Sequence, residues 1–169
     1  MERKKLGVAL VGLGSYSEGQ LGPALKETKH CYLAGIVSGS EKKRRSWRKE
    51  YDIHESNIYS YEDFDSIKNN EAVDIVYVVL PNSLHKEYVI RAAKAGKHVI
   101  CEKPMANTVE ECEEMITARK EAGVMLSIGY RLHFDPFNLE MMRLASEKVY
   151  GNVKRISASH GLSSAHGWR

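Results

Sequence analysis

The chain has 169 residues and a formal net charge of +3, with 43% hydrophobic and 28% charged residues. This composition is that of an ordinary globular protein, and the length suits one well-buried domain but not two full ones. So small an excess of positive charge does not by itself argue for nucleic-acid binding.

The cysteines, the N-terminal residues and the lengths of the apolar runs indicate where in the cell the protein is expected. Cys31, Cys101 and Cys112 lie far apart without a CxxC pair, which predicts reduced thiols rather than a disulfide framework or zinc site. Residues 1–5 lead directly into the first apolar run and leave no room for a signal peptide. The longest apolar stretch, residues 75–80, is far shorter than the roughly 20 residues of a membrane span. We therefore expect a cytoplasmic protein without membrane contact or bound metal.

Short apolar runs alternate with longer amphipathic segments along the chain. Each run is rich in Val, Ile or Leu with little polar alternation, as expected for strands that are covered on both faces. The runs are Leu6 to Val11, Tyr32 to Val37, Ile75 to Leu80, His98 to Cys101 and Met125 to Ile128. Strands that alternate with helices predict an α/β fold with a doubly wound parallel sheet, the Rossmann arrangement.

Helix boundaries are marked between these runs. Thr108 and Glu111 have the spacing of a capping box, in which the hydroxyl accepts from a free amide and the carboxylate reaches back. Gly96 and Gly123 are placed to end the helices before the last two runs, because glycine adopts the left-handed terminal conformation at little cost.

The pattern changes past residue 130. Asp135 followed by proline predicts an N-cap and a helix from Pro136 to about Glu147, and one more strand is expected from Val153 to Ser159. A lone strand has no sheet of its own to join. We therefore expect a Rossmann domain over residues 1–130. Residues 131–169 are expected to be the truncated start of a second α/β domain for substrate binding and oligomerisation.

A glycine turn follows the first predicted strand and precedes a helical pattern. Gly12 permits the tight turn, and Gly14 lets the backbone approach a pyrophosphate at the helix N-terminus. Ser17 takes the third small position and allows close packing of helix on strand. A plain strand-to-helix turn is the alternative, but the place in the first strand–helix unit favours a dinucleotide site. The candidate cofactor-binding residues here are Gly12, Gly14, Ser15 and Tyr16.

The end of the second strand lacks the carboxylate that usually binds the ribose diol of NAD. Ser38 and Gly39 stand at this tip, and a cationic run, residues 42–49, follows. Hydroxyls and cations suit a 2′-phosphate, so Ser38 and one or two of the cations predict NADP, with NAD as the alternative. Most of the run is interpreted as a solvated helix face. A nucleic-acid patch is disfavoured because interleaved aromatic residues are lacking apart from Trp47.

The third run ends at the carboxyl edge of the sheet, where open α/β sheets bind ligands. The candidate cofactor contacts there are Leu80, Pro81, Asn82 and His85. A core or surface position explains His85 equally well. A metal role is disfavoured because no second ligand has a suitable spacing.

Glu102, Lys103 and Pro104 follow the next strand. A lysine on the floor of such a crevice can hold a substrate hydroxyl and favour its alkoxide as a hydride leaves. From the residues alone, a surface salt bridge between Lys103 and Glu102 is the better interpretation of this pair.

Together these segments resemble the glucose–fructose oxidoreductase and inositol dehydrogenase (Gfo/Idh/MocA) family. The resemblance runs over nearly the whole chain and is most specific where Glu-Lys-Pro follows an Ala-Gly-Lys-His strand entry. The segments that carry it are the glycine turn and residues 80–85, 95–98, 101–104 and 129–136.

The resemblance implies an N-terminal Rossmann domain followed by an α/β domain with a large open sheet, through which a homo-oligomer is expected to form. It assigns Lys103 to catalysis and Pro104 to a turn that is often cis. It also implies that Ser38 and Lys43 contact a 2′-phosphate. It implies that the turn at Pro104 sets the nicotinamide pocket and that Tyr130 and Arg131 line the substrate side. The residues that complete the cofactor-binding set are Glu102, Lys103, Pro104, Arg131, Trp168 and Arg169.

The catalytic set implied by the family is incomplete in this chain. The second catalytic residue, a Tyr or His acting as general acid/base, lies in the C-terminal domain, and nothing up to Arg169 matches it. We therefore expect an NAD(P)-dependent dehydrogenase of a sugar or polyol, with no nucleic-acid partner, whose 169 residues alone show no turnover. A non-catalytic dinucleotide-binding or sugar-sensing module is the alternative, which the intact Lys103 disfavours.

Overall fold

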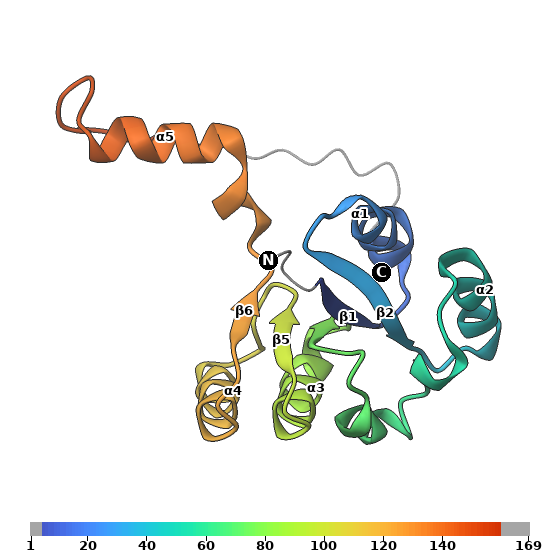
Figure 1. The fold of residues 1–169 in the computed structure, drawn as a ribbon. Coiled ribbons are helices and arrows are strands. Elements are labelled where there is room, and N and C mark those ends of the chain that lie inside the picture. Colours follow the sequence, from blue (N-terminus) through green and yellow to red (C-terminus); the bar gives the residue numbers. More distant parts are fainter. Residues whose placement is uncertain (1–4, 160–169) are drawn as a thin grey trace. The chain divides into compact units, whose positions relative to one another are not determined.

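The computed structural model describes residues 5–159, which fall into two units divided between Tyr130 and Arg131 (Figure 1). The first unit is built on a six-stranded parallel sheet with the order β3-β2-β1-β4-β5-β6. The strands are β1 (Leu6–Val11), β2 (Cys31–Val37), β3 (Ile58–Tyr59), β4 (Ile75–Val78), β5 (His98–Cys101) and β6 (Leu126–Ile128). The predicted doubly wound parallel sheet is confirmed. β3 was not predicted, because two residues are too few to give a pattern.

Helices fill the connections between the strands. A π-helical turn (Ser17–Leu21) continues directly into α1, and short 3₁₀ turns (Glu55–Asn57 and Phe64–Asn69) flank β3. The α-helices of this unit are α1 (Gly22–Glu27), α2 (Glu41–Tyr51), α3 (Asn82–Lys94) and α4 (Val109–Glu121). The strand order reverses between β1 and β4, and open α/β sheets bind their ligands at the carboxyl ends of the strands beside such a switch point.

The central strand β1 is apolar on both faces. Val8 and Leu10 pack in the cluster that includes residues of α1 and α2, whereas Ala9 and Val11 pack in the cluster that includes residues of α3 and α4. All four are at most 2% exposed. Because successive strand residues point to opposite faces, helices on both sides of the sheet require a continuous apolar run. This requirement explains why the runs in the sequence lack polar alternation.

The helix boundaries that the sequence marks are confirmed. The Thr108 hydroxyl accepts from the Glu111 amide at 3.2 Å, and the Glu111 carboxylate reaches back to the amide of Asn107 at 3.0 Å. Gly96 and Gly123 have φ angles of +73° and +66°, the left-handed conformation that ends a helix.

The second unit contains a 3₁₀ turn (Arg131–Phe134) and α5 (Pro136–Ser146). The carboxylate of Asp135 accepts from the amides of Phe137 and Asn138 at 3.0 and 3.2 Å, as an N-cap does. The predicted strand over residues 153–159 is wrong, because this segment has no regular secondary structure. A β-strand requires a hydrogen-bonded neighbour, and the described second unit supplies none. No helix within residues 5–159 is long and apolar enough to cross a membrane.

Candidate functional site: a dinucleotide crevice at the carboxyl edge of the sheet

The glycine turn leaves β1 at the edge of the sheet. Gly12 has a φ of +97°, and a Cβ atom added to it would lie 2.2 Å from the carbonyl oxygen of Val79, so only glycine fits. The hydroxyl of buried Ser17 donates to the Gly12 carbonyl at 2.6 Å and holds the helix start against the turn. Nothing lies within 4 Å of a Cβ atom added to Gly14, so its backbone is open to a ligand.

The glycine turn packs directly on the turn that follows β4. The Cβ atom added to Gly12 would also lie 3.0 Å from the Leu80 side chain, and the Val79 amide donates to the carbonyl of Val11 at 2.8 Å. The structure therefore brings together two predicted cofactor-binding segments, although Gly12 and Leu80 are 68 residues apart in the sequence. Pro81 and Asn82 continue this turn into the start of α3.

The tip of β2 forms the neighbouring part of the same edge. Ser38 is 5% exposed, and its hydroxyl accepts from the amide of Ser40 at 3.2 Å. The Ser40 hydroxyl in turn caps α2 by accepting from the Lys43 amide at 3.3 Å. The sequence therefore provides hydroxyl groups and no carboxylate within residues 38–40.

Two adjacent cations in the first turns of α2 reach different parts of this edge. Lys43 Nζ donates to the Leu13 carbonyl at 2.5 Å and forms an ion pair with Glu18 at 2.8 Å, so it lies against the glycine turn. The guanidinium of half-buried Arg44 donates to the carbonyl of Ser38. Neither Arg44 nor Glu18 was singled out in the sequence. The available signal for Arg44 was its place in the cationic run close behind Ser38.

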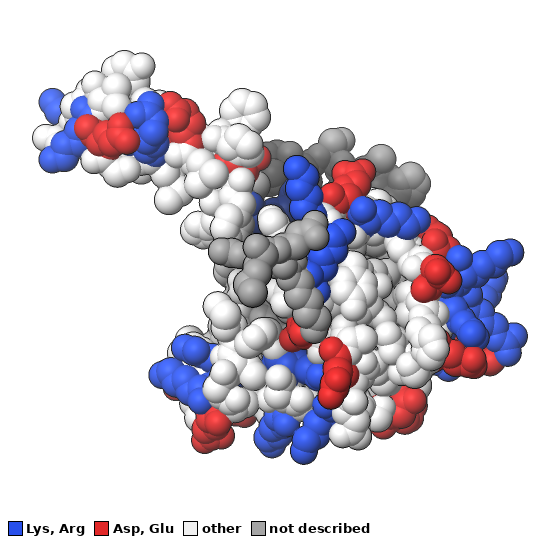
Figure 2. Space-filling view, in the orientation of Figure 1, with Lys and Arg blue, Asp and Glu red and all other residues white. Residues whose placement is uncertain are grey.

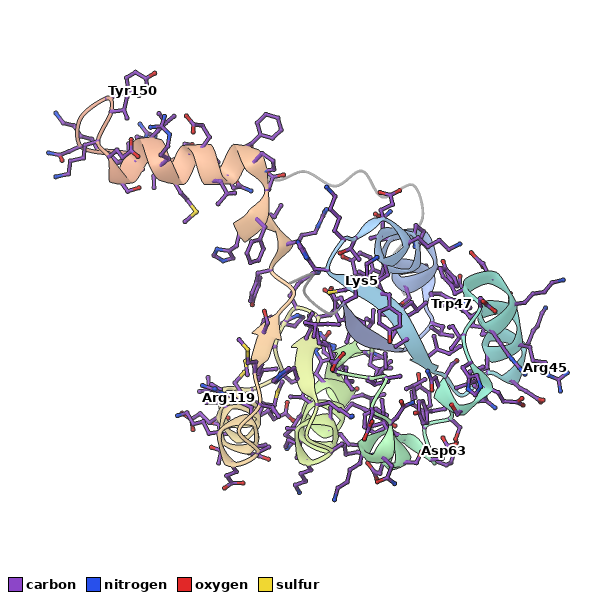
Figure 3. The ribbon with its side chains drawn as sticks, viewed as in Figure 1. Lys5, Arg45, Trp47, Asp63, Arg119 and Tyr150 are labelled. Carbon is purple, nitrogen blue, oxygen red and sulfur yellow. The ribbon has the colours of Figure 1, made fainter. Side chains whose placement is uncertain are left out.

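The remaining cations of α2 face away from the crevice. Figure 2 shows Lys and Arg gathered on the outer side of this helix among Asp and Glu, and Figure 3 shows Arg45 pointing outward while Trp47 points inward. Arg45 pairs with Glu41, and Arg48 pairs with Glu55 at 3.2 Å. The interpretation of most of this run as a solvated helix face therefore agrees with the structure.

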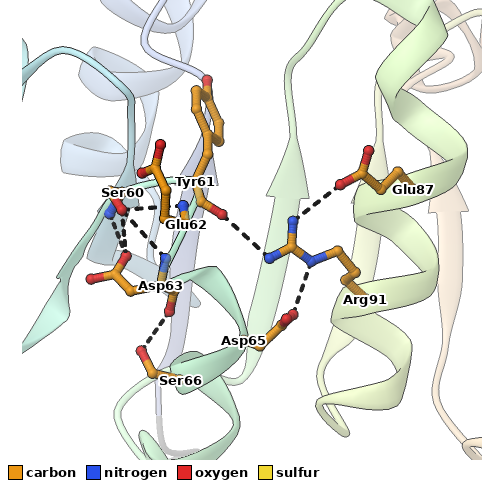
Figure 4. Close-up of polar contacts among 8 residues, drawn as sticks. All are labelled: Ser60, Tyr61, Glu62, Asp63, Asp65, Ser66, Glu87 and Arg91. Atoms are coloured by element: carbon orange, nitrogen blue, oxygen red, sulfur yellow. Dashed lines mark hydrogen bonds and ion pairs between the residues drawn. The ribbon is translucent and has the colours of Figure 1, made fainter.

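The loop after β3 borders the tip of β2. A Cβ atom added to Gly39 would lie 3.3 Å from the ring of Tyr61, so the glycine and the ring are in close contact. Arg91 of α3 holds this loop by donating to the Tyr61 carbonyl at 3.3 Å and to the Asp65 carboxylate at 2.9 Å (Figure 4). The carboxylate of Glu87 accepts from the same guanidinium at 3.1 Å. Tyr61, like Arg44 and Glu18, is a residue at this edge that the sequence analysis did not single out.

His85 lies inside the protein and does not face the crevice. Its side chain is completely buried, with one ring nitrogen 2.8 Å from the carbonyl oxygen of Leu80 and the other 2.9 Å from that of Pro104. The core alternative therefore describes this histidine. Through these two contacts it lies between the turns that follow β4 and β5.

The carboxylate of Glu102 is held at the tip of β5. Its Oε1 accepts from the hydroxyl of Tyr77 at 2.7 Å, and its Oε2 accepts from the backbone amide of Lys103 at 3.2 Å. Burial and then the hydrogen bond to Glu102 raise the pKa of Tyr77, so its hydroxyl keeps the proton that it donates.

The Lys103 side chain is exposed. The peptide bond between Lys103 and Pro104 is cis. No carboxylate of the described residues forms an ion pair with its ammonium group. The salt bridge to Glu102 that the residues alone favoured is therefore absent from the described chain. The Glu102 carboxylate instead has two other partners.

Arg131 belongs to the second unit and is exposed there, and Trp168 and Arg169 lie outside the described residues. No cluster of three or more potential metal-ligating side chains occurs among residues 5–159.

Comparison with protein families places this edge in a known context. Residues 6–130, which include the whole sheet, match the Gfo/Idh/MocA model, an oxidoreductase family with an NAD-binding Rossmann fold. The chain belongs to this family. The family resemblance stated from the sequence is thereby confirmed.

Individual relatives of the chain have names that describe enzymes acting on sugars and polyols. The chain is 35% identical over 128 residues to the D-xylose 1-dehydrogenase [NADP(+)] of Haloarcula marismortui, covering 76% of the chain and 35% of that protein. It is also 35% identical over 111 residues to a scyllo-inositol 2-dehydrogenase (NADP(+)) of Bacillus subtilis, covering 66% of the chain and 33% of that protein.

A solved structure extends the comparison to three dimensions. The aldose-aldose oxidoreductase from Caulobacter crescentus, complexed with glycerol, shares 52% identity and a TM-score of 0.82 over 83% of the chain. The match covers 42% of that enzyme. The chain thus spans well under half the length of the relatives that it matches.

Proposed function

We propose that this chain forms the cofactor-binding part of an NADP-dependent oxidoreductase that acts on the hydroxyl or carbonyl group of a sugar or polyol. The observation that carries the proposal is the tip of β2, where the Ser38 hydroxyl and the Arg44 guanidinium occur together and residues 38–40 include no carboxylate. A carboxylate there would bind a ribose diol and repel a 2′-phosphate, whereas a hydroxyl and a guanidinium can donate to one.

The rest of the edge fits the other parts of a dinucleotide. The open backbone at Gly14 and the helix start behind it suit a pyrophosphate, because backbone amides and the positive end of the helix dipole would attract its negative charge. Gly39 and Tyr61 would border the adenosine end, and the turns at Leu80–Asn82 and Glu102–Pro104 would border the nicotinamide end. Buried His85 supports the two latter turns rather than touching the cofactor.

Lys103 is assigned the catalytic role within this proposal. A bound nicotinamide supplies the acceptor or donor of the hydride. The exposed ammonium group of Lys103, which has no carboxylate partner among the described residues, can donate to a substrate hydroxyl and stabilise negative charge that develops on its oxygen. Such stabilisation is often worth about 3 kcal/mol.

A second group must accept the hydroxyl proton, and we place it in a further domain. This further domain would also provide most substrate contacts and the interface of a homo-oligomer.

The names of the relatives, D-xylose and scyllo-inositol dehydrogenases, support a sugar or polyol as substrate.

The test compares turnover by the 169-residue chain with that of a chain extended to the length of its relatives. NADP reduction is measured with glucose, D-xylose and inositol. We expect turnover only in the extended chain, and Lys103→Ala should reduce it by about 100-fold, the loss typical of one electrostatic donor. Turnover by the 169 residues that depends on Lys103 would contradict the placement of the proton acceptor. An extended chain that is unaffected by Lys103→Ala would contradict the role of Lys103.

A further inference from the structure

The hydroxyl of Tyr77 is the one side-chain partner that the described structure gives to the Glu102 carboxylate. Tyr77 stands on β4 and Glu102 follows β5, so the contact crosses between adjacent parallel strands at their carboxyl ends. Its length of 2.7 Å is that of a good hydrogen bond from a hydroxyl to a carboxylate.

Both oxygens of this carboxylate are engaged, and the space around it is limited. Oε1 accepts from Tyr77, and Oε2 accepts from the amide of Lys103. A Cβ atom added to Gly129, which follows β6, would lie only 2.9 Å from Oε1. Groups from three neighbouring strand ends therefore surround the carboxylate.

Glu102 and Lys103 are consecutive residues of opposite charge, so a surface ion pair between their side chains is the arrangement that would occupy the Lys103 ammonium group. An exposed carboxylate that lacked its hydrogen bond would be attracted to the nearest cation. In the described chain the Lys103 ammonium nevertheless has no carboxylate partner. The hydrogen bond from Tyr77 to the Glu102 carboxylate competes with such an ion pair.

We propose that Tyr77 is a positioning residue that holds the Glu102 carboxylate away from the Lys103 ammonium group and so keeps Lys103 available to a substrate oxygen. The inference rests on the proposed role of Lys103 and adds a residue that was not a candidate in the sequence. Tyr77 acts through Glu102 and touches neither substrate nor cofactor in this scheme.

The test measures how fast Lys103 is acylated in the 169-residue chain without cofactor. A trace of acetic anhydride labels the lysines, and mass spectrometry compares Lys103 with exposed Lys94 of the same molecule as the internal reference. An ion-paired ammonium reacts more slowly, because the pair holds its proton and restricts its motion. Tyr77→Phe should therefore slow the relative labelling of Lys103 by about two- to fivefold, the range of an exposed ion pair.

A second substitution separates positioning from a general structural effect. In the double variant Tyr77→Phe/Glu102→Gln the amide has no charge to pair with Lys103, so the labelling rate should return to that of the original chain. Tyr59→Phe is the matched control, because the hydroxyl of this tyrosine also has a side-chain hydrogen bond, which it accepts from Asn70 at 2.7 Å, but Tyr59 lies on β3. It should leave Lys103 unchanged.

Three results would overturn the proposal. The first is an unchanged labelling rate in folded Tyr77→Phe, and the second is a slow rate that Glu102→Gln fails to restore. The third applies even if Tyr77→Phe does not fold: Glu102→Gln alone should leave the rate unchanged, and an increase of severalfold would show that Glu102 already pairs with Lys103. Because no cofactor or substrate is present, these outcomes are independent of the cofactor preference and of turnover.

Discussion

Arg44 and Arg45 are adjacent on α2 and differ in what they contact. Arg44 donates to the Ser38 carbonyl at the tip of β2, whereas Arg45 pairs with Glu41 on the outer face of the helix. The two arginines therefore allow the effect of a positive charge at the crevice to be separated from the effect of net charge on the same helix.

We expect Arg44→Ala to weaken NADP binding by about 1–3 kcal/mol, the range for a charge-assisted hydrogen bond, and to change NAD binding little. Arg45→Ala, the matched control, removes the same charge and should leave both affinities nearly unchanged. Calorimetric titration of both variants with both cofactors provides the measurement. An equal loss for NADP and NAD, or an equal effect of the two substitutions, is incompatible with a 2′-phosphate contact of Arg44.

The residues of the crevice differ in how far the sequence could predict them. Gly12 and Gly14 were predictable because their spacing after an apolar run reports a local turn. The partners of Lys43 were not, since its contact with Glu18 depends on how α2 lies against the glycine turn, which no local pattern encodes. The role of Tyr77 was not predictable for a related reason. In a buried strand a tyrosine fits the apolar pattern, and only the pairing of β4 with β5 shows that its hydroxyl contacts Glu102.

At the scale of elements, the loop after β3 depends on one side chain of α3. Arg91 contacts the Tyr61 carbonyl and the Asp65 carboxylate, and its guanidinium lies 4.9 Å from the ring centres of Phe64 and Tyr88. These contacts fix the backbone that carries the Tyr61 ring against Gly39.

Arg91→Met keeps the aliphatic stem and removes the donors, so we expect faster hydrogen exchange in residues 60–66. NADP and NAD should both bind more weakly by about 1 kcal/mol, because the loop borders the adenosine that the two cofactors share. Lys94→Met, at the exposed end of the same helix, is the control for a lost charge. Exchange in residues 60–66 that matches the unsubstituted chain would show that Arg91 does not hold the loop.

The elements themselves were predictable to the extent that their signals are local. The five longer strands carry apolar runs, and Thr108, Asp135 and the two terminal glycines mark helix ends by their own side-chain or backbone chemistry. The strand expected over residues 153–159 failed for the opposite reason. Its apolar residues have strand propensity, but a strand exists only with a neighbour, and propensity does not supply one.

At the scale of the whole molecule, the described sheet reverses its strand order between β1 and β4, and every candidate segment of the first unit lies at strand carboxyl ends. The glycine turn, the tip of β2 and the turns after β4 and β5 thus meet at one edge. Their convergence follows from the parallel topology, because consecutive parallel strands end on the same side of a sheet. The family match over residues 6–130 gives this edge its general role in binding a nicotinamide dinucleotide.

The most direct measurement of the central claim is the affinity of the unsubstituted 169-residue chain for NADP and for NAD under identical buffer and salt. Because the tip of β2 offers Ser38 and Arg44, and residues 38–40 include no carboxylate, we expect NADP to bind more tightly by about 1–3 kcal/mol. The preference should shrink as salt is raised, since part of it is an interaction between charges near the surface. Equal affinity for the two cofactors, or tighter binding of NAD, would contradict the assignment of this edge to a 2′-phosphate.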